Sequence, residues 1–260
     1  MRTSNHHWDT LRSPDFLERR TDRDIAIIPI GSTEQHGPHL PVMVDSRLAA
    51  EIAMRAAKIT TGGARVLITP VVWVSMAEHH MVFPGTLTLD FETFRAVLRC
   101  LAESLMRQGF RRILFLNGHG GNIAALSIIT DQLTRELRLP LMAATYWNVS
   151  ASEFDAILEG QANLLHACEA ETSMMMTLHP ELVDAEAALN VISPSGGFGE
   201  IRGAYRTRSM KEISPSGVVG MPSLATREKG QALLDAAARA LGKKLSDDTW
   251  WGDAEPDETR

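Results

Sequence analysis

The chain has 260 residues, of which 44% are hydrophobic and 22% charged, and its 26 basic and 32 acidic side chains give a net charge of −6. This composition argues against a disordered chain, and the acidic balance argues against sequence-independent binding to nucleic acid, which requires a basic surface. Two cysteines are too few for a disulfide framework or a four-thiolate zinc site.

Strand and helix patterns alternate along the chain. Short apolar runs rich in β-branched residues predict strands at 25–30, 65–73, 112–116 and 141–146. Apolar side chains at helical spacing predict helices at 45–58, 90–108, 122–137, 169–178 and 226–244. This order predicts a three-layer α/β/α sandwich around a mostly parallel sheet, in a single domain that spans residues 1–260.

Two regions have no such periodicity. Residues 193–223 are rich in glycine, serine and proline and predict a long loop, of the kind that often covers an active site. The acidic tail at 246–260 contains Trp250 and Trp251 and is expected either to fray or to dock on a neighbouring subunit.

The N-terminal segment and the hydropathy of the chain bear on its location. The first ten residues, MRTSNHHWDT, lack the apolar core of a signal peptide. No apolar run has the length of a membrane-spanning helix. We therefore expect a soluble cytoplasmic protein with neither a membrane nor a nucleic acid as its partner.

Three potential metal ligands lie within twelve residues, directly after the first predicted strand. Glu34 and His36 are two positions apart, so extended backbone would turn both side chains to the same side. Asp45 lies where the chain enters the next predicted helix. Carboxylate and imidazole groups together suit zinc, manganese or iron. Because ligand sites in open α/β sheets form beyond the carboxyl ends of strands, this loop is suitably placed for a metal site.

Two further segments contain the same residue types. LNGHGGN at 116–122 follows the third predicted strand, and its glycines let a ligand approach the backbone around His119. The segment lacks the lysine and the spacing of a phosphate-binding loop, which makes a phosphate site the weaker interpretation. In HACEAETS at 166–173, helical geometry would put His166 and Glu169 on one face. Together the three segments predict a two-metal hydrolytic site.

These segments resemble the motifs of the creatininase (creatinine amidohydrolase) family. The resemblance extends from about residue 24 to about residue 242 and rests on IPIGSTEQHGPHLPVMVD, FPGTLTLD, LNGHGGN, HACEAETS and SLATREKG. It implies a creatininase-type α/β/α fold and a metal-dependent hydrolase with two divalent ions per subunit. It also implies a homo-oligomer, commonly a hexamer.

The resemblance further implies which residues bind the metals. The five expected ligands are Glu34, His36, Asp45, His119 and Glu169. Asp45 would bridge the two ions. Glu34 and His119 would complete one site, and His36 and Glu169 the other. The metal could be zinc, manganese or iron, because mixed oxygen and nitrogen ligands accept several ions.

The chain departs from creatinine-hydrolysing members at two places. Those members have NGHYEN where this chain has Gly120–Gly121 after the histidine, and their glutamate binds metal, so we expect Glu169 to replace it. They also have a Trp-Asp pair before the histidine that matches His166, where this chain has Ala162–Asn163. Other branches resemble this chain better, namely a formamide deformylase, a mycofactocin-precursor peptidase and an inositol-pathway hydrolase.

The expected reaction is hydrolysis of a C–N bond in a small or cyclic amide by a metal-bridging hydroxide. The ions would lower the pKa of their shared water and polarise the scissile carbonyl. His166 is the expected general acid or base, and its alternative role is to orient Glu169. The candidate substrate-binding residues are His80, Gly120, Tyr146 and Trp147, although core packing explains the last two equally well.

Three alternatives remain open. A creatinine amidohydrolase proper, or a peptidase or deformylase of the same family, would use the same centre. A non-catalytic metal-binding sensory or scaffold protein would keep the ligands but would need neither an accessible pocket nor His166. A nucleotide-binding module would be stabilised by phosphate and would need no metal.

Overall fold

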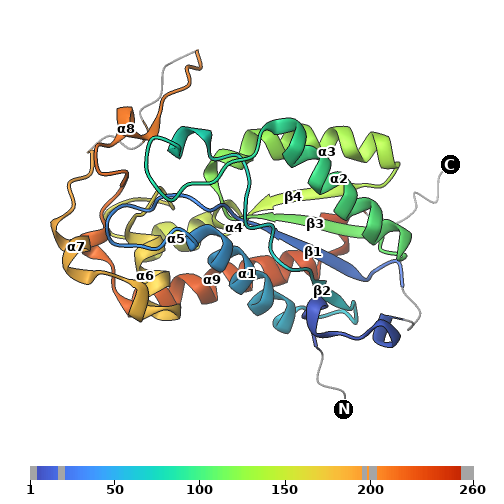
Figure 1. Cartoon of the computed structure of the whole chain (residues 1–260). Helices are drawn as coiled ribbons and strands as arrows, with labels where there is room; N and C mark the ends of the chain where they lie inside the picture. Colours follow the sequence, from blue (N-terminus) through green and yellow to red (C-terminus); the bar gives the residue numbers. More distant parts are fainter. Residues whose placement is uncertain (1–4, 17–20, 195–197, 199–203, 253–260) are drawn as a thin grey trace.

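The computed structural model describes residues 5–16, 21–194, 198 and 204–252. In this part of the chain, a four-stranded parallel sheet lies between two layers of helices (Figure 1). The strands, in the spatial order β2-β1-β3-β4, are β1 (Ile25–Ile30), β2 (Val66–Ile68), β3 (Arg112–Asn117) and β4 (Leu141–Thr145). The predicted α/β/α sandwich with a parallel sheet is confirmed.

Helices cover both faces of the sheet (Figure 1). One layer contains α1 (Val44–Ile59), α6 (Glu169–Leu178) and α9 (Arg227–Leu245), and the other contains α2 (Phe91–Arg107) and α3 (Ile123–Leu137). The shorter helices are α4 (Tyr146–Val149), α5 (Ala151–Ile157), α7 (Ala185–Asn190) and α8 (Met210–Ile213). Among the described helices, none is both long enough and apolar enough to cross a membrane.

The strands are almost entirely apolar because both faces of the sheet are covered. All six residues of β1 are buried. Ile25 and Ile27 pack toward α1 and α9, whereas Ile28 and Ile30 pack toward α2 and α3. Burying each isoleucine contributes about 1.5–3 kcal/mol, so this one strand ties the two cores together.

β2 is shorter than the strand predicted at 65–73. It pairs with β1 only from Val66 to Ile68. Thr69 still donates a backbone hydrogen bond to Ile27 O at 3.0 Å. Pro70 has no N–H group and therefore interrupts the ladder, which the chain rejoins only where Val72 donates to Pro29 O at 2.9 Å.

The strand order brings the carboxyl ends of β1 and β3 together. The connection through α1 leads to β2 on one side of β1, and the connection through α2 leads to β3 on the other side. Just beyond the two strand ends, Gly118 N donates to Ile30 O at 2.7 Å. In open α/β sheets such a reversal of strand order forms a crevice in which ligands bind.

The two tryptophans of the tail pack against the core of this chain. Trp251 is buried, and its Nε1 donates to Leu245 O at the end of α9 at 3.3 Å. The guanidinium of Arg112 lies 5.6 Å from the centre of the Trp251 ring. Trp250 packs against the same core. Residues 253–260 of the tail, and residues 195–197 and 199–203 of the predicted long loop, lie outside the described residues.

Gly230 lets α9 pack directly on α6. A Cβ atom at this position would lie only 1.9 Å from Ser173 O, a backbone atom of α6. We expect Gly230→Ala to lower the free energy of unfolding by about 1–3 kcal/mol, because the two helices would have to move apart. Each kcal/mol lost should lower the Tm by about 2–4 °C, so a thermal unfolding experiment should detect the change.

Gly242→Ala is the matched control for this prediction because it makes the same change in the same helix. The nearest atom to its Cβ would be Ile59 Cγ1 at 2.8 Å, in an exposed side chain at the end of α1, and the nearest backbone atom, Ala56 O, would lie at 3.2 Å, much farther than Ser173 O does from a Cβ at position 230. The better helix propensity of alanine, about 1 kcal/mol, offsets this contact. Equal melting temperatures for the two variants would contradict the role given to Gly230.

Candidate metal centre

Buried acidic and histidine side chains converge at the crevice between β1 and β3. Glu34 and His36 follow β1, and Asp45 lies in the first turn of α1. His119 follows β3, and Glu171 lies in the first turn of α6. Two further histidines join them, one from the 3-10 turn at 78–80 and one from the segment before α6. The complete cluster, each member of which is 5% exposed or less, is Glu34, His36, Asp45, His80, His119, His166 and Glu171.

The cluster contains two groups that share Asp45. In the first, His119 Nδ1 lies 3.0 Å from Glu34 Oε2 and 3.0 Å from Asp45 Oδ2. In the second, His36 Nε2 lies 3.2 Å from Asp45 Oδ1 and 3.7 Å from Glu171 Oε1. Asp45 therefore turns one carboxylate oxygen toward each group.

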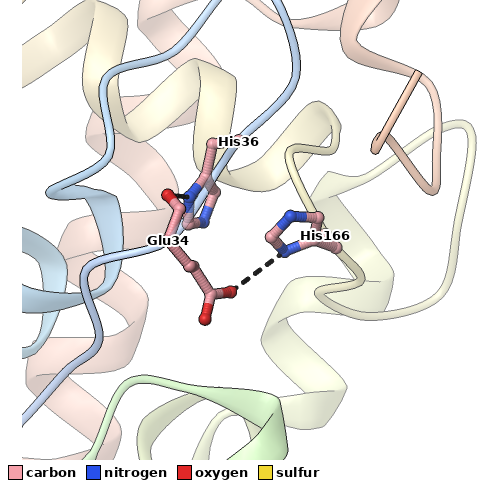
Figure 2. Close-up of side chains that lie close together, drawn as sticks. All are labelled: Glu34, His36 and His166. Carbon is pink, nitrogen blue, oxygen red and sulfur yellow. Dashed lines mark hydrogen bonds and ion pairs between the residues drawn. The ribbon is translucent and has the colours of Figure 1, made fainter. Parts of the chain in front are cut away.

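A third group lies beside these two and is drawn in Figure 2. Glu34 and His36 come from the same stretch of chain, and the Glu34 carboxylate reaches toward His166 (Figure 2). His166 Nδ1 is 3.5 Å from Glu34 Oε1, and the rings of His36 and His166 are 4.4 Å apart between centres.

Hydrogen bonds to backbone carbonyls assign the proton positions on three of these histidines. A carbonyl can only accept, so the ring nitrogen beside it carries the hydrogen. In a neutral ring the other nitrogen then turns a lone pair toward the carboxylates, and a cation is needed between the two electron-rich groups. The three pairs are His36 Nδ1 with Glu34 O at 3.0 Å, His119 Nε2 with Met76 O at 3.2 Å, and His166 Nε2 with Gln35 O at 2.9 Å.

The buried oxygens of the cluster also fit a cation. Among the described residues, no donor makes a well-directed hydrogen bond to either carboxylate oxygen of Glu34, or to Asp45 Oδ2. A buried carboxylate without such partners is strongly destabilising. Oxygen and nitrogen ligands of zinc lie about 2.0–2.2 Å from the metal, and therefore about 3.0–3.5 Å from one another. The spacings in the two groups that share Asp45 are close to this range, so the residues present fit divalent metal ions.

Without a cation, protons balance the charge of the carboxylates. Burial lowers the pKa of His119, but Glu34 and Asp45 outweigh burial and raise it to about 10. The pKa of His36 is likewise raised, against burial, by Asp45 and Glu171. Metal binding must displace protons held at these two rings, so metal affinity should weaken as the pH falls.

Glu169 does not reach the cluster, which corrects its expected role as a ligand. Its buried carboxylate accepts hydrogen bonds from Lys229 Nζ at 2.6 Å and from Gly160 N at 2.9 Å. The expected shared helical face is absent because α6 begins only at Glu169. His166 precedes the helix in extended backbone, and Ala167 has a left-handed φ of 50°. The two side chains therefore point in different directions.

Glu171 occupies the place expected of Glu169. It is the third residue of α6, and its Oε2 accepts a hydrogen bond from Cys168 N at 3.4 Å, which folds the side chain back over the start of the helix. Oε1 is thereby turned toward His36. The signal in the sequence was the predicted start of the helix at Glu169, because a glutamate at the third helical position commonly folds back in this way.

Three of the four predicted substrate-binding residues line a cavity of about 410 Å³ beside the cluster, namely His80, Gly120 and Trp147. Tyr146 is not among its lining residues, which corrects that prediction. Its ring is buried in the core between Trp147 and Phe154. The sequence reasoning missed His79, which lines the cavity and stacks on His119 with 5.6 Å between ring centres. The His79–His80 pair was the available signal.

The cavity adjoins an outer groove of about 990 Å³. The groove runs between the segment at 76–90 and the segment at 204–213, and His79, Gly121, Phe198 and Ile213 line both spaces. The cavity beside the cluster therefore has a larger space next to it.

The sequence of this chain is similar to those of known hydrolases. The sequence profile of the Creatininase family, described as creatinine amidohydrolase, matches residues 9–245. A mycofactocin precursor peptide peptidase from Mycobacterium ulcerans is 32% identical over 214 residues, covering 80% of this chain and 78% of the relative. A creatinine amidohydrolase from Pseudomonas putida is 26% identical over 242 residues, covering 86% of this chain and 89% of the relative.

Solved structures share the fold. A creatininase mutant of the Zn-Zn type superimposes with a TM-score of 0.79 at 23% identity, covering 95% of this chain and 99% of that one. At this level of identity the likeness concerns the arrangement of strands and helices.

Proposed function

Since this chain belongs to the creatininase family, whose members include a creatinine amidohydrolase and a peptide peptidase, we propose that it is a binuclear metal-dependent amidohydrolase acting on a small amide. One observation carries the proposal. The two oxygens of Asp45 face different histidines, which suits a carboxylate that bridges two ions. A site for a single structural ion would have no use for this arrangement.

The chain's own residues divide between the two proposed sites. Glu34, Asp45 and His119 would hold one ion, and His36, Asp45 and Glu171 the other. Divalent ions bound here, such as zinc, manganese or iron, would polarise the scissile carbonyl and make a nearby water more acidic. Backbone carbonyls fix the orientation of His36 and His119, so the other ring nitrogens stay beside the carboxylates that would hold the ions.

We assign the movement of protons to His166. Burial and the neighbouring histidines lower its pKa well below the ordinary value, so the ring is neutral at pH 7. Its Nε2 donates to Gln35 O, which leaves Nδ1 free to take a proton from the attacking water and to pass it to the departing nitrogen. His166 also lines the cavity, where a substrate would meet it.

The two spaces beside the cluster favour different substrates. A cavity of about 410 Å³ suits a small or cyclic amide. The outer groove of about 990 Å³ favours a second candidate, hydrolysis of a C–N bond in a peptide, because an extended chain would need that additional space.

Metal analysis combined with an amide screen tests the proposed function. Protein purified without chelator should contain about two divalent ions per chain. We expect it to release amine from at least one compound in a panel of formamides, cyclic amides including creatinine, and short peptides. A chelator should abolish the release, and added zinc or manganese should restore it.

Two outcomes would count against the proposal. Two bound ions without turnover of any compound would support a metal-binding scaffold instead. Failure to bind zinc or manganese, even after their addition, would contradict the ligand assignment itself.

A further inference from the structure

Gln35 lies between two of the proposed ligands in the sequence, but its buried side chain contacts neither of them. Its Nε2 lies 2.9 Å from His80 Nδ1, 3.0 Å from His166 Nε2 and 3.0 Å from Gly217 O. On the other side of the amide, Oε1 accepts a hydrogen bond from Gly37 N at 2.8 Å. The amide therefore lies against two histidines of the cluster and cannot flip without losing its own partners.

The number of hydrogens on the Gln35 amide determines which of these neighbours it can bond. The amide has two N–H hydrogens and three neighbours. Gly217 O can only accept, so it takes one hydrogen. His166 Nε2 already carries a hydrogen that it donates to Gln35 O at 2.9 Å, so it cannot accept another. The second hydrogen of the amide goes to His80 Nδ1.

His80 and His166 thereby acquire opposite functions. With Nδ1 accepting, a neutral His80 carries its hydrogen on Nε2, which lies 3.3 Å from Glu34 Oε1. His166 instead presents the lone pair of Nδ1 to the same carboxylate oxygen, 3.5 Å away. The two rings are adjacent, with 4.5 Å between their centres.

Gly217 holds the amide in place. A Cβ atom at this position would lie 2.1 Å from Gln35 Oε1, and the φ of +76° is one that residues with side chains rarely adopt. The same segment also supports His166. His166 N donates to Val219 O at 3.1 Å, and Val219 N donates to His166 O at 2.8 Å.

We propose that Gln35 is a positioning residue: its side-chain amide, seated against Gly217, keeps the proton of His80 on Nε2, while its backbone carbonyl leaves the lone pair of His166 on Nδ1. The inference rests on the proposed function for its catalytic meaning, but the proton positions can be measured without any turnover. Gln35 acts only through the two histidines and has no contact with the substrate cavity of its own.

Histidine proton positions can be read directly from long-range ¹H–¹⁵N NMR spectra. The sample is ¹⁵N-histidine-labelled, zinc-loaded protein, with signals assigned from His80→Asn and His166→Asn. We expect both rings to carry the hydrogen on Nε2. In Gln35→Glu, the new carboxylate can only accept, so His80 should move its hydrogen to Nδ1. A hydrogen on Nδ1 of His80 in the unaltered protein, or no change in Gln35→Glu, would overturn the proposal.

A matched pair of glycine variants separates this effect from backbone strain. Gly63 has a φ of +79°, close to that of Gly217, but it is exposed and its Cβ would meet nothing within 4 Å. Gly217→Ala should displace the Gln35 amide and alter the His80 signal, whereas Gly63→Ala should leave the spectrum unchanged. Similar spectra for the two variants would contradict the positioning role.

Kinetics on the amide identified by the screen add a second readout. Gly217→Ala and Gln35→Glu should lower kcat by about 10- to 100-fold while KM and the zinc content stay close to those of the unaltered protein. Lost zinc, or a rise in KM at constant kcat, would indicate a different role for Gln35. If no amide is hydrolysed, the proposed function fails while the NMR result still decides the positioning role.

Discussion

Replacing Asp45 by asparagine is expected to remove both metal ions and, with them, hydrolysis. The asparagine side chain has one oxygen and one NH₂ group, so it cannot bridge two cations. Its NH₂ hydrogens would point at whichever ion the oxygen did not bind. We expect the affinity for zinc to fall by more than about 100-fold. Metal content per chain after gel filtration, with zinc-dependent thermal stability as a second measurement, checks this result.

Thermal stability is informative because zinc should bind only the folded protein. At a free concentration about 1,000-fold above Kd, one bound ion contributes about 4 kcal/mol, and Asp45→Asn should lose that increment. A variant that kept two ions per chain would contradict the bridging role of Asp45.

His166→Ala provides the contrast. It should keep both ions and lose about 10²- to 10⁴-fold in rate, because it removes a proton carrier and leaves the ligand sets intact. Loss of metal from this variant would instead make His166 a ligand, as its place beside Glu34 and His36 allows.

Glutamine substitutions at two neighbouring positions of α6 form the second decisive test. Glu171→Gln should lose about one of the two ions. Two carboxylate oxygens lie beside His36 Nε2, one from Asp45 and one from Glu171, and this variant removes the second carboxylate. Glu169→Gln should keep both ions, because Glu169 binds Lys229 and not the cluster. The measurement is metal content per chain, with zinc titration to distinguish a lost site from a weakened one.

Glu169→Gln, which should keep its metal, should nevertheless be the less stable of the two variants. Glu169→Gln leaves a lysine ammonium beside a neutral amide and should lower the free energy of unfolding by about 1–3 kcal/mol. Full metal content in Glu171→Gln together with loss of an ion in Glu169→Gln would restore the assignment expected from the sequence.

The sequence predicted most of the fold because its signals are local. Apolar runs marked the strands and helical spacing marked the helices, and α6 begins and ends at the predicted residues. The observed strand order brings together the loops that contain Glu34 and His119, and right-handed crossovers then place α1 and α2 on opposite faces of the sheet. These two residues could be identified from the sequence because each directly follows a strand.

The incorrect predictions concern side chains whose direction depends on the backbone conformation of a single residue. Helical spacing between His166 and Glu169 assumed a continuous helix, but the left-handed φ of Ala167 breaks it. Tyr146 and Trp147 are adjacent on a single turn of helix, so the sequence could not say which ring faces the cavity. Gln35 attracted no attention because an amide between two metal ligands has no recognisable pattern.

The packing of α9 on α6 bears on how the protein is made. Glu171 depends on a helix whose first turn is anchored by Lys229, and the close contact at Gly230 lies one residue further along. We therefore expect a nascent chain to complete the proposed second metal site only after residues 227–245 have left the ribosome. Loading of a second ion would then belong to the last stage of synthesis or to the period after release. Truncations before α9 should yield chains able to assemble at most the first site.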